Sequence, residues 1–326
     1  MTSPLAPDAL GPTICVGEIL VEIMATTVGR GFLQPQPLEG PFPSGAPAIF
    51  IDQCARMGGT AALIGSVGDD DFGRMTLARL ARDGVDVRAV AVLPDHPTGT
   101  AFVRYRADGA RDFVYNIARS AAACIARTPA VEAVLARAGH LHVMGSALSI
   151  PAAAEVIVAA ATTVKARGGS LSVDPNLRKE LAQDAATART FAALVAMADL
   201  LLPSGDELER AAGVAGEAAA LERLFALGAR EVALKRGAGG ASVFAAGAAP
   251  VHAPAFAVDE VDPTGAGDCF GGAYVACRRL GLPVAEALTY ACAAGARNVT
   301  RRGPMEGAGT RSELDTFIAN TPRRPC

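Results

Sequence analysis

Short apolar runs alternate with alanine-rich stretches of helical length along most of this chain, and this order constrains the fold more than any other feature. Strands are predicted at 13–16, 61–66, 141–144, 170–174, 200–202 and 231–235, with a hairpin strand at 241–245. Helices are predicted near 47–57, 72–83, 151–167, 185–198, 217–227, 268–279 and 284–299. Strands that alternate with helices pair in parallel, so we predict an α/β fold with a central, mostly parallel sheet flanked by helices.

Two segments in the N-terminal half, 18–38 and 98–117, break this alternation. The runs 100–105 and 111–115 flank Asp108-Gly109, which is typical of an antiparallel hairpin. Since both segments lie at the ends of core strands, they predict a small β-sheet lid over the carboxyl edge of the main sheet. We therefore expect one domain over 14–317, with lid segments at about 18–38 and 98–120. Residues 1–13 and 318–326 are expected to be tails, the first of them loose.

Composition favours a globular protein that binds small ligands. The chain has 326 residues, 51% of them hydrophobic, and a formal net charge of -3, so it lacks the basic surface that nucleic acid or an anionic membrane requires. Its seven cysteines contain no C-x-x-C pair, and residues 1–13 carry no basic side chain. Long apolar stretches are interrupted, as by Glu155. A cytoplasmic protein without a membrane span is expected.

Several common catalytic motifs are absent. None of the three lysines follows a glycine, so no G-x-x-x-x-G-K-[ST] loop exists, and no strand is followed by G-x-G-x-x-G. H-E-x-x-H and G-x-S-x-G are also missing. His140-Leu-His142 could form a metal-binding pair, but no third ligand accompanies it, so both rings are expected to face solvent.

The informative segment is Asp262-Pro-Thr-Gly-Ala-Gly-Asp268-Cys-Phe-Gly-Gly272, which precedes a helix of small apolar residues. Gly265, Ala266 and Gly267 leave successive backbone N–H groups open, and a helix N-terminus adds partial positive charge. Such a loop can hold a phosphate or the charge of its transition state. Asp268 stands beside these donors, where a carboxylate can take a proton from a hydroxyl. The alternative is an ordinary N-cap at Asp268.

This segment resembles, residue for residue, the D-x-T-G-A-G-D signature of the ribokinase-type (PfkB) carbohydrate kinase family. The resemblance runs from about Ile14 to Phe317, because further motifs follow in family order. They are Gly17-Glu18, Ser44-Gly45-Ala46-Pro47, Gly65–Asp69 with Phe72-Gly73, Asp174–Arg178, Pro203–Glu207 and Lys235–Gly240. The resemblance implies a ribokinase-like fold with a β-sheet lid, MgATP as phosphoryl donor, and Asp268 as the base that deprotonates a sugar hydroxyl. It also implies a homodimer formed through the lid.

The resemblance assigns a nucleotide and metal site. Lys235, Gly237 and Gly240 match the loop along which ATP lies, together with Gly265 and Gly267. Glu207 matches the acidic residue that organises Mg²⁺, while Ser204 stands where the family has Asn, and its hydroxyl can still bond phosphate or water. Asp262, the carbonyl of Thr264 and Gly303 in the facing loop resemble a monovalent-cation site, so K⁺ is a further expectation.

The sugar pocket departs from the family pattern. Glu22 replaces the usual Asp, Ser44 precedes Gly45 where a Gly pair is usual, and Ile49 replaces an Asn. Glu22 can still accept bonds from two hydroxyls but reaches about a methylene further. Ile49 donates nothing, unless Asp52 supplies polarity from the next turn. Arg178 resembles either a carboxylate clamp or a structural ion pair, and both readings stay open.

These residues favour a neutral ketohexose such as fructose or tagatose. Kinases of acid sugars in this family usually add a lid arginine after a tyrosine pair, whereas this chain has Phe113-Val-Tyr115-Asn116-Ile-Ala-Arg119. The alternatives within the same chemistry are 2-keto-3-deoxygluconate, ribose and a nucleoside. A sugar sensor without catalysis is the alternative from another class, although Asp268 and its glycine loop argue against it.

Overall fold

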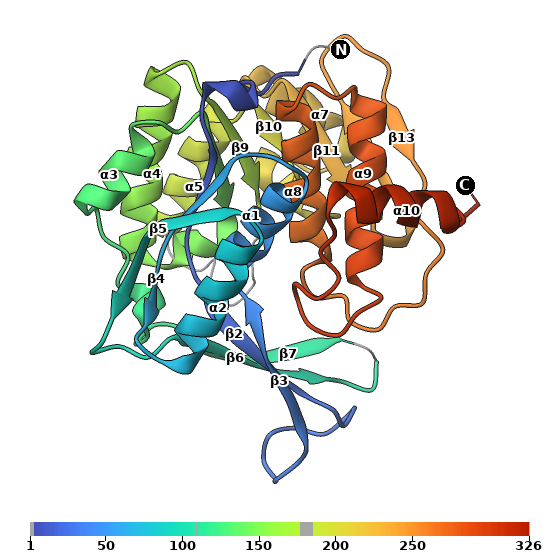
Figure 1. The fold of residues 1–326 in the computed structure, drawn as a ribbon. Helices are drawn as coiled ribbons and strands as arrows, with labels where there is room; N and C mark the ends of the chain where they lie inside the picture. The colour runs from blue at the N-terminus through green and yellow to red at the C-terminus, as the bar shows by residue number, and fades with distance from the viewer. Residues whose placement is uncertain (1–2, 109, 177–184, 326) are drawn as a thin grey trace.

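The computed structural model describes residues 3–108, 110–176 and 185–325, and Figure 1 shows a large α/β body with a small sheet projecting from it. The main sheet has the strand order β13-β12-β11-β10-β9-β8-β1-β4-β5. Its parallel strands are β1 (Thr13–Val16), β4 (Ala61–Gly68), β5 (Val85–Leu93), β8 (His140–Met144), β9 (Ser170–Asp174), β10 (Leu200–Leu201) and β11 (Glu231–Lys235). β12 (Ala241–Phe244) and β13 (Val251–Ala253) add an antiparallel edge. The predicted fold class is confirmed.

The β5 strand was missed by the sequence prediction. It forms the opposite edge of the sheet, and only Val85 and Ala89 along it are buried. Asp86 and Arg88 lie within it and pair with each other at 2.8 Å. An edge strand that is half in water carries such charges, so it lacks the continuous apolar run that predicted the inner strands.

Helices cover both faces of the sheet, and alternation along the strands decides which face each side chain joins. In β1 and β4, Cys15 and Leu63 belong to one buried cluster, while Ile14 and Ile64 belong to the other. The first cluster includes α1 (Ala46–Arg56), α8 (Ala266–Arg279) and α9 (Val284–Asn298). The second includes α3 (Pro129–Leu135), α4 (Pro151–Ala166), α5 (Ala185–Met197), α6 (Glu207–Ala212) and α7 (Glu217–Ala226). The described helices also include α2 (Asp71–Arg82) and α10 (Arg311–Asn320).

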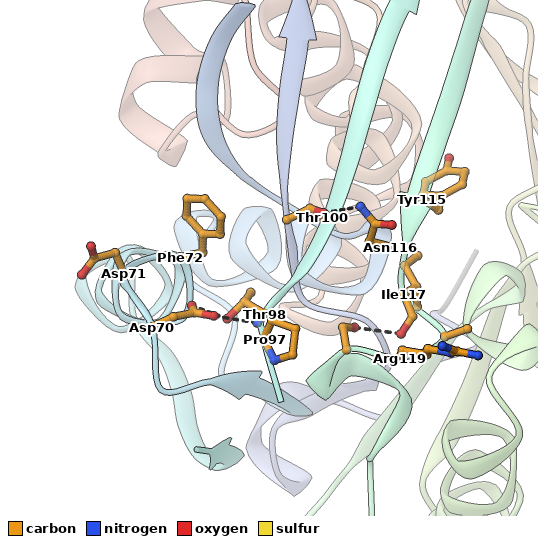
Figure 2. A pocket seen from close by; sticks show the side chains of 12 residues that line it. Asp70, Asp71, Phe72, Pro97, Thr98, Thr100, Tyr115, Asn116, Ile117 and Arg119 are labelled. Carbon is orange, nitrogen blue, oxygen red and sulfur yellow. Dashed lines mark hydrogen bonds between the residues drawn. The ribbon is translucent and has the colours of Figure 1, made fainter. Parts of the chain in front are cut away.

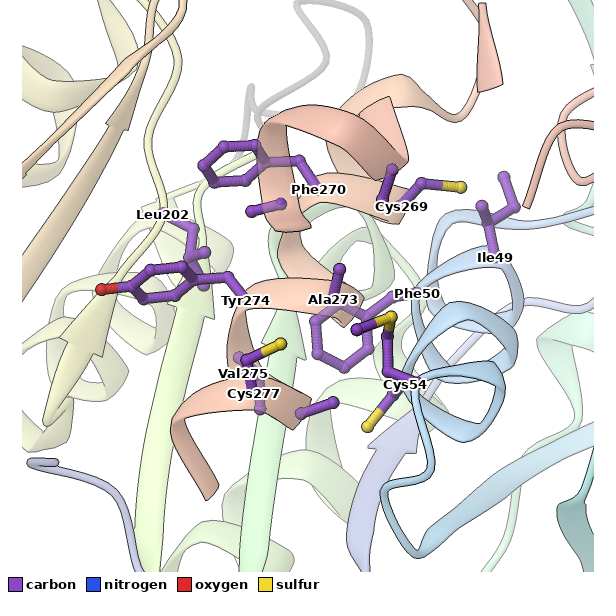
Figure 3. Close-up of a cluster of buried hydrophobic side chains, with 14 of the residues drawn as sticks. Ile49, Phe50, Cys54, Leu202, Cys269, Phe270, Ala273, Tyr274, Val275 and Cys277 are labelled. Atoms are coloured by element: carbon purple, nitrogen blue, oxygen red, sulfur yellow. The ribbon is translucent and has the colours of Figure 1, made fainter. Parts of the chain in front are cut away.

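Close packing of α8 on α1 fixes the helix that carries Asp268. A Cβ at Gly272 would lie 2.3 Å from the Phe50 carbonyl oxygen, so only glycine permits this approach. Figure 3 shows Phe50 and Cys54 of α1 beside Cys269, Ala273 and other side chains of α8. These residues are almost completely buried. The N-terminus of α8 is therefore held by a dense core rather than by a loop alone.

The small sheet has the order β3-β2-β6-β7, built from β2 (Leu20–Ala25), β3 (Leu38–Ser44), β6 (Gly99–Tyr105) and β7 (Arg111–Asn116). The hairpin expected at 100–105 and 111–115 is β6 and β7, which pair antiparallel. The first lid segment continues past residue 38, because β3 runs to Ser44. Since β2 and β6 pair in parallel, the two segments that break the helix–strand alternation form one sheet.

The expectation of a loose N-terminal tail was wrong for the residues that the structure describes. Leu5 is buried, and the Arg279 guanidinium donates to the carbonyl oxygens of Ala6, Pro7 and Gly11. The C-terminal residues also pack: α10 continues to Asn320, and the Arg323 guanidinium lies 3.6 Å from the centre of the Phe256 ring. Both termini thus cover the body of the domain.

The two histidines of β8 were wrongly expected to face solvent. His140 and His142 are fully buried, and their rings contact Ser170 and Ser172 of β9 at 2.7 to 2.8 Å. His142 also stacks on Phe50, with ring centres 3.6 Å apart. Burial holds the pKa of both imidazoles well below the usual value, so both rings are neutral. They form a buried polar cluster inside the sheet.

Candidate active site

Most of the predicted site residues line a cavity between the lid and the carboxyl edge of the main sheet, where open α/β folds place their ligands. The cavity measures about 320 Å³. It is lined by Glu22, Ser44, Ala46, Ile49, Arg111, Phe113, Tyr115, Asp174, Asn176, Ser204, Glu207, Lys235, Pro263, Thr264, Gly265, Gly267 and Asp268. Arg178 lies outside the described residues. The residues predicted separately from the N-terminal and C-terminal halves thus share one cavity.

Asp268 lies in the first turn of α8, behind a loop that only glycine can form. Gly265 precedes the helix with a φ of 79°, and a Cβ there would lie 2.3 Å from the Pro304 carbonyl oxygen. The helix begins at Ala266, two residues earlier than expected, so Asp268 is not the N-cap. The first N–H groups of a helix have no partner within it. Asp268 and the N-terminal amides of α8 therefore border the same cavity.

Lys235 brings a buried positive charge to this helix end. Its ammonium contacts the Asp174 carboxylate at 2.5 Å, with side-chain exposures of 11% and 3%. Lys235 ends β11 and Asp174 ends β9, so the parallel sheet brings them together. Burial lowers the pKa of Lys235, but the carboxylates of Asp174, Glu207 and Asp268 more than offset this effect, so the ammonium stays charged. A Cβ at Gly267 would lie 3.6 Å from the Nζ of Lys235.

Ser204 and Glu207 border the cavity from the turn after β10. The Ser204 backbone N–H donates to a Glu207 carboxylate oxygen at 2.7 Å, which fixes that side chain at the start of α6. Ser204 also forms a parallel bridge with Lys235. Within the residues that the structure describes, no group of three His, Cys, Asp or Glu side chains could hold a metal by itself. A metal here would therefore depend on ligands from a bound substrate or water.

A second cavity of about 350 Å³ adjoins the first and shares Ser204, Lys235, Pro263 and Gly267 with it. Gly237 and Gly240 border it at the turn between β11 and β12, as predicted. Its other walls are mainly apolar and include Ala255, Phe256, Val258, Phe270, Cys292, Ala296 and Val299. Sequence reasoning missed these walls because they come from three separate segments, 255–258, 270 and 292–299. The shape and chemistry suit a flat, mostly apolar ring such as a nucleobase.

The other end of the site is narrow and carries buried carboxylates. The Ser44 hydroxyl donates to Glu22 at 2.7 Å, and the Ser146 hydroxyl donates to Glu18 at 2.8 Å. These four residues, with Gly45, line one continuous recess beside Tyr115. Glu18 and Ser146 were not assigned to the site from the sequence. Two buried carboxylates suit a polyhydroxylated ligand and disfavour an anionic one.

Asp52 does not supply the polarity that Ile49 lacks. Its side chain is completely buried, and its neighbours are Arg79, Arg56 and Asp83 rather than residues of the cavity. Burial raises the pKa of Asp52 to about 8, partly offset by Arg79. Arg79 and Asp83 lie in α2 and at its C-terminal end, so Asp52 faces α2 rather than the cavity.

Asp262, Thr264 and Gly303 lie together, as predicted. One carboxylate oxygen of Asp262 accepts from the Thr264 amide and hydroxyl at 3.0 and 2.7 Å, and the other accepts from the Gly303 amide at 3.0 Å. The Thr264 carbonyl accepts from the Asn298 side-chain amide at 2.7 Å. The oxygens proposed as cation ligands thus already have donors from the chain. They also hold the glycine loop in place.

Lid side chains form the roof of the cavity. Phe113 and Tyr115 of β7 stack with ring centres 5.2 Å apart. Arg111 at the start of β7 donates to the Thr264 hydroxyl at 2.6 Å, across 153 positions of sequence. Sequence reasoning missed Arg111, because a charge at a hairpin end is indistinguishable from an ordinary surface residue until the lid is placed on the core.

A larger hollow lies outside this site. It measures about 710 Å³ and lies where α2 meets the start of the lid strand β6 (Figure 2). Its Asp70 accepts from the Thr98 amide and hydroxyl, both at 2.7 Å, and from the Gly73 amide at 2.8 Å. Asp70 is thus the N-cap of α2 and joins it to the lid. None of the residues predicted for the site lines this hollow.

A glycine loop at a helix N-terminus, a carboxylate in the first turn and a buried lysine are what phosphoryl transfer to a hydroxyl requires. On this α/β fold with its β-sheet lid, they define a ribokinase-like kinase. Residues 14–311 match the family model described as pfkB family carbohydrate kinase. The chain belongs to this family, whose members phosphorylate a sugar hydroxyl.

Individual relatives agree with this assignment. The chain is 32% identical over 315 residues to fructokinase-1 of Oryza sativa subsp. japonica, covering 92% of this chain and 95% of that protein. An E. coli protein provisionally named ribokinase II, solved with ATP and Mg²⁺, has a TM-score of 0.89 and 43% identity, covering 95% and 99% of the two chains. A fructokinase double mutant from Vibrio cholerae O395, solved with fructose, ADP and potassium, has a TM-score of 0.79 and 26% identity, covering 94% and 98%.

Proposed function

We propose that this protein is an ATP-dependent kinase of a ketohexose, with fructose as the leading substrate and tagatose as the next. The observation that carries the proposal is the convergence of Asp268, the glycine loop and Lys235 on one cavity whose narrow end holds Glu22. The similarity to fructokinases over more than nine-tenths of the chain supports the sugar class.

In the proposed reaction, Asp268 takes the proton of a sugar primary hydroxyl as that oxygen attacks the terminal phosphate of ATP. The amides of Gly265, Ala266 and Gly267 at the start of α8, together with the Lys235 ammonium, stabilise the charge on the transferred group. Lid closure excludes water that would otherwise compete with the sugar. Asp268 lies in the first turn of α8, whose partial positive charge favours its ionised form.

The residues present fit Mg²⁺ bound together with ATP. The Glu207 carboxylate accepts a hydrogen bond from the Ser204 backbone N–H and lines the part of the cavity where we place the phosphates of ATP. Mg²⁺ typically takes one or two carboxylates and completes its shell with phosphate oxygens and water, so one acidic residue suffices. When bound, the ion neutralises phosphate charge. Glu207 would hold it, and Ser204 would keep Glu207 in place.

We propose that K⁺ activates the enzyme without being required. Asp262 and the Thr264 carbonyl already accept hydrogen bonds from the chain, so the loop is ordered without an added cation. Replacing KCl by N-methylglucamine chloride should lower kcat by less than about tenfold, because one cation contact adds to a formed loop. Complete loss of turnover without K⁺ would contradict this.

The test must also distinguish two alternative substrates, ribose and a keto-deoxy acid. Ribose is favoured by the 43% identity to the E. coli ribokinase II. A keto-deoxy acid would need a cation in the pocket, and Arg111 of the lid lines the cavity. Against the acid stand Glu18 and Glu22, whose buried carboxylates would repel it. A neutral sugar therefore remains the proposal.

The test measures ATP consumption by wild type and by Asp268→Asn against fructose, tagatose, ribose, nucleosides and 2-keto-3-deoxygluconate. We expect a ketohexose to give the highest kcat/KM, and Asp268→Asn to lower kcat by about 10²–10⁴. Fluorescence titration with ADP should show unchanged nucleotide affinity in the variant. Tight sugar binding without turnover would instead favour a sensor.

We also propose a homodimer formed through the outer face of the lid. Leu38 and Val114 are 45% and 51% exposed, and Leu33 is 97% exposed. With Phe32 and Phe102 they line a shallow apolar hollow on that face. Exposed apolar patches of this kind favour association. Light scattering should show a dimer that Val114→Asp dissociates, while Val158→Asp on the exposed side of α4, a matched surface valine, should not.

A cytoplasmic location is part of the proposal. The cysteines that the structure describes are free thiols, five of them buried and Cys124 partly so. Buried thiols that form no disulfide are typical of a reducing compartment. Within the described residues, no helix has both the length and the apolar character that crossing a bilayer needs. Fractionation of the native host would test this location.

A further inference from the structure

Arg111 joins the lid to the catalytic loop. Its guanidinium donates to the Thr264 hydroxyl at 2.6 Å, and that hydroxyl donates in turn to the Asp262 carboxylate at 2.7 Å. Thr264 immediately precedes Gly265, which forms the left-handed turn before α8. A chain of two hydrogen bonds thus runs from the lid to the segment that positions Gly265, Ala266, Gly267 and Asp268.

A second lid residue points to the same segment. Tyr105 lies directly opposite Arg111 in the β6–β7 pair, so the two side chains project from the same face of the lid. Burial raises the pKa of Tyr105, and the nearby Asp262 carboxylate raises it further. Its phenol therefore stays neutral beside Asp262. One cross-strand pair at the lid tip thus faces one short stretch of the core.

The next pair along the hairpin contains a second arginine, Arg104, with which Arg111 can be compared. Arg104 lies opposite Asp112 and pairs with it at 2.7 Å, with about a third of each side chain exposed. Since side chains alternate between the faces of a strand, this pair projects away from the cavity. Arg104 and Arg111 therefore differ mainly in the face of the lid from which they project.

We propose that Arg111 is a positioning residue for phosphoryl transfer, which couples closure of the lid to the geometry of the glycine loop through Thr264. This inference rests on the proposed kinase function. With the lid closed, the charge-assisted bond to Thr264 holds the loop and Asp268 in the reactive arrangement. With the lid open, this bond is broken and the loop keeps only its hydrogen bonds to the core. Closure over a bound sugar thereby completes the site.

The test compares Arg111→Ala, Thr264→Val and the double variant, using whichever sugar wild type phosphorylates best. Arg104→Ala is the matched control, and Thr264→Ser keeps the hydroxyl. Loss of one charge-assisted hydrogen bond should lower kcat by about tenfold or more in each single variant. Affinity for ADP should change less than about twofold, because the nucleobase cavity does not include Arg111. Arg104→Ala should resemble wild type, Thr264→Ser should keep most of the kcat that Thr264→Val loses, and Arg111→Lys should recover part of the loss of Arg111→Ala.

The double variant decides the mechanism. If Arg111 acts through Thr264, adding Arg111→Ala to Thr264→Val should cause little further loss of kcat. Losses that multiply would overturn the inference, because Arg111 would then act on the substrate directly. An unchanged kcat in Arg111→Ala would overturn it as well. Absence of turnover by wild type with every sugar would instead refute the kinase proposal, so the two failures are distinguishable.

Discussion

Replacing Lys235 by methionine should separate the structural role of the Lys235–Asp174 pair from its catalytic role. The change removes the ammonium from a carboxylate that is only 3% exposed. Breaking a buried ion pair on one side costs about 3–5 kcal/mol, because the remaining charge is desolvated without a partner. Lys235 borders a cavity that water can enter, so we expect a loss near the lower end, about 3 kcal/mol at pH 8.

The size of this loss should depend on pH. Burial raises the pKa of Asp174 above 3.8 even with Lys235 beside it, and Lys235→Met removes the charge that lowers this pKa. A carboxyl with a raised folded pKa destabilises the fold increasingly as pH rises above the unfolded value. The difference in unfolding free energy between wild type and variant should therefore be smaller at pH 5.5 than at pH 8. Urea denaturation followed by circular dichroism measures it.

The double variant Lys235→Met, Asp174→Asn removes the uncompensated charge as well. It should regain most of the stability, while kcat/KM stays lower by about 10² or more because a cation that stabilises the transition state is absent. Lys165→Met is the control, since the Lys165–Asp199 pair is more exposed, at 34% and 14%, and should cost less than about 1 kcal/mol. Recovered activity in the double variant would refute the catalytic role. A loss of stability equal to that of Lys165→Met would refute the burial argument.

Two further predictions follow from the buried groups and the glycine loop. Because burial lowers the folded pKa of His140 and His142, acid should destabilise the fold below pH 6.5. Between pH 7.5 and 5.5, wild type should lose about 1.4 kcal/mol more unfolding free energy than His142→Phe. Equal losses in urea titrations of the two proteins would contradict this. Gly265→Ala should abolish turnover and lower the melting temperature, because the added Cβ would clash with Pro304. Gly213→Ala is the control, since Gly213 has a similar φ of 70° but open space around it, and should cost only about 1 kcal/mol. Equal melting temperatures of the two variants would show that the loop adapts.

The sequence predicted the inner sheet closely because those strands are buried on both faces. β1, β9 and β11 begin and end where the apolar runs do. The D-P-T-G-A-G-D segment located the loop and Asp268, because glycine is required where the chain turns left-handed before a helix. The sequence missed β5 because polar side chains occupy this edge strand. It missed the packing of the N-terminal segment because backbone carbonyls of that segment bind the Arg279 side chain. Local composition contains no signal for such contacts.

Contacts between distant segments explain why the rest of the site was not predictable. Lys235 and Asp174 are 61 positions apart, and Arg111 and Thr264 are 153 apart. Neither pair follows from local periodicity. Lys235, Asp174 and Arg111 are at strand ends and Thr264 is in the loop before α8, so the topology of the fold sets their neighbours in space. The motif resemblance assigned a role in the site to one partner of each pair, Lys235 and Thr264, whereas Asp174 was only the first residue of a matching motif. The structure identifies the other partners. Asp174 meets Lys235 where the carboxyl ends of β9 and β11 are adjacent, and Arg111 meets Thr264 where the lid covers them. The residues that tune this kinase are therefore best sought among such second partners, to which the motifs assign no role.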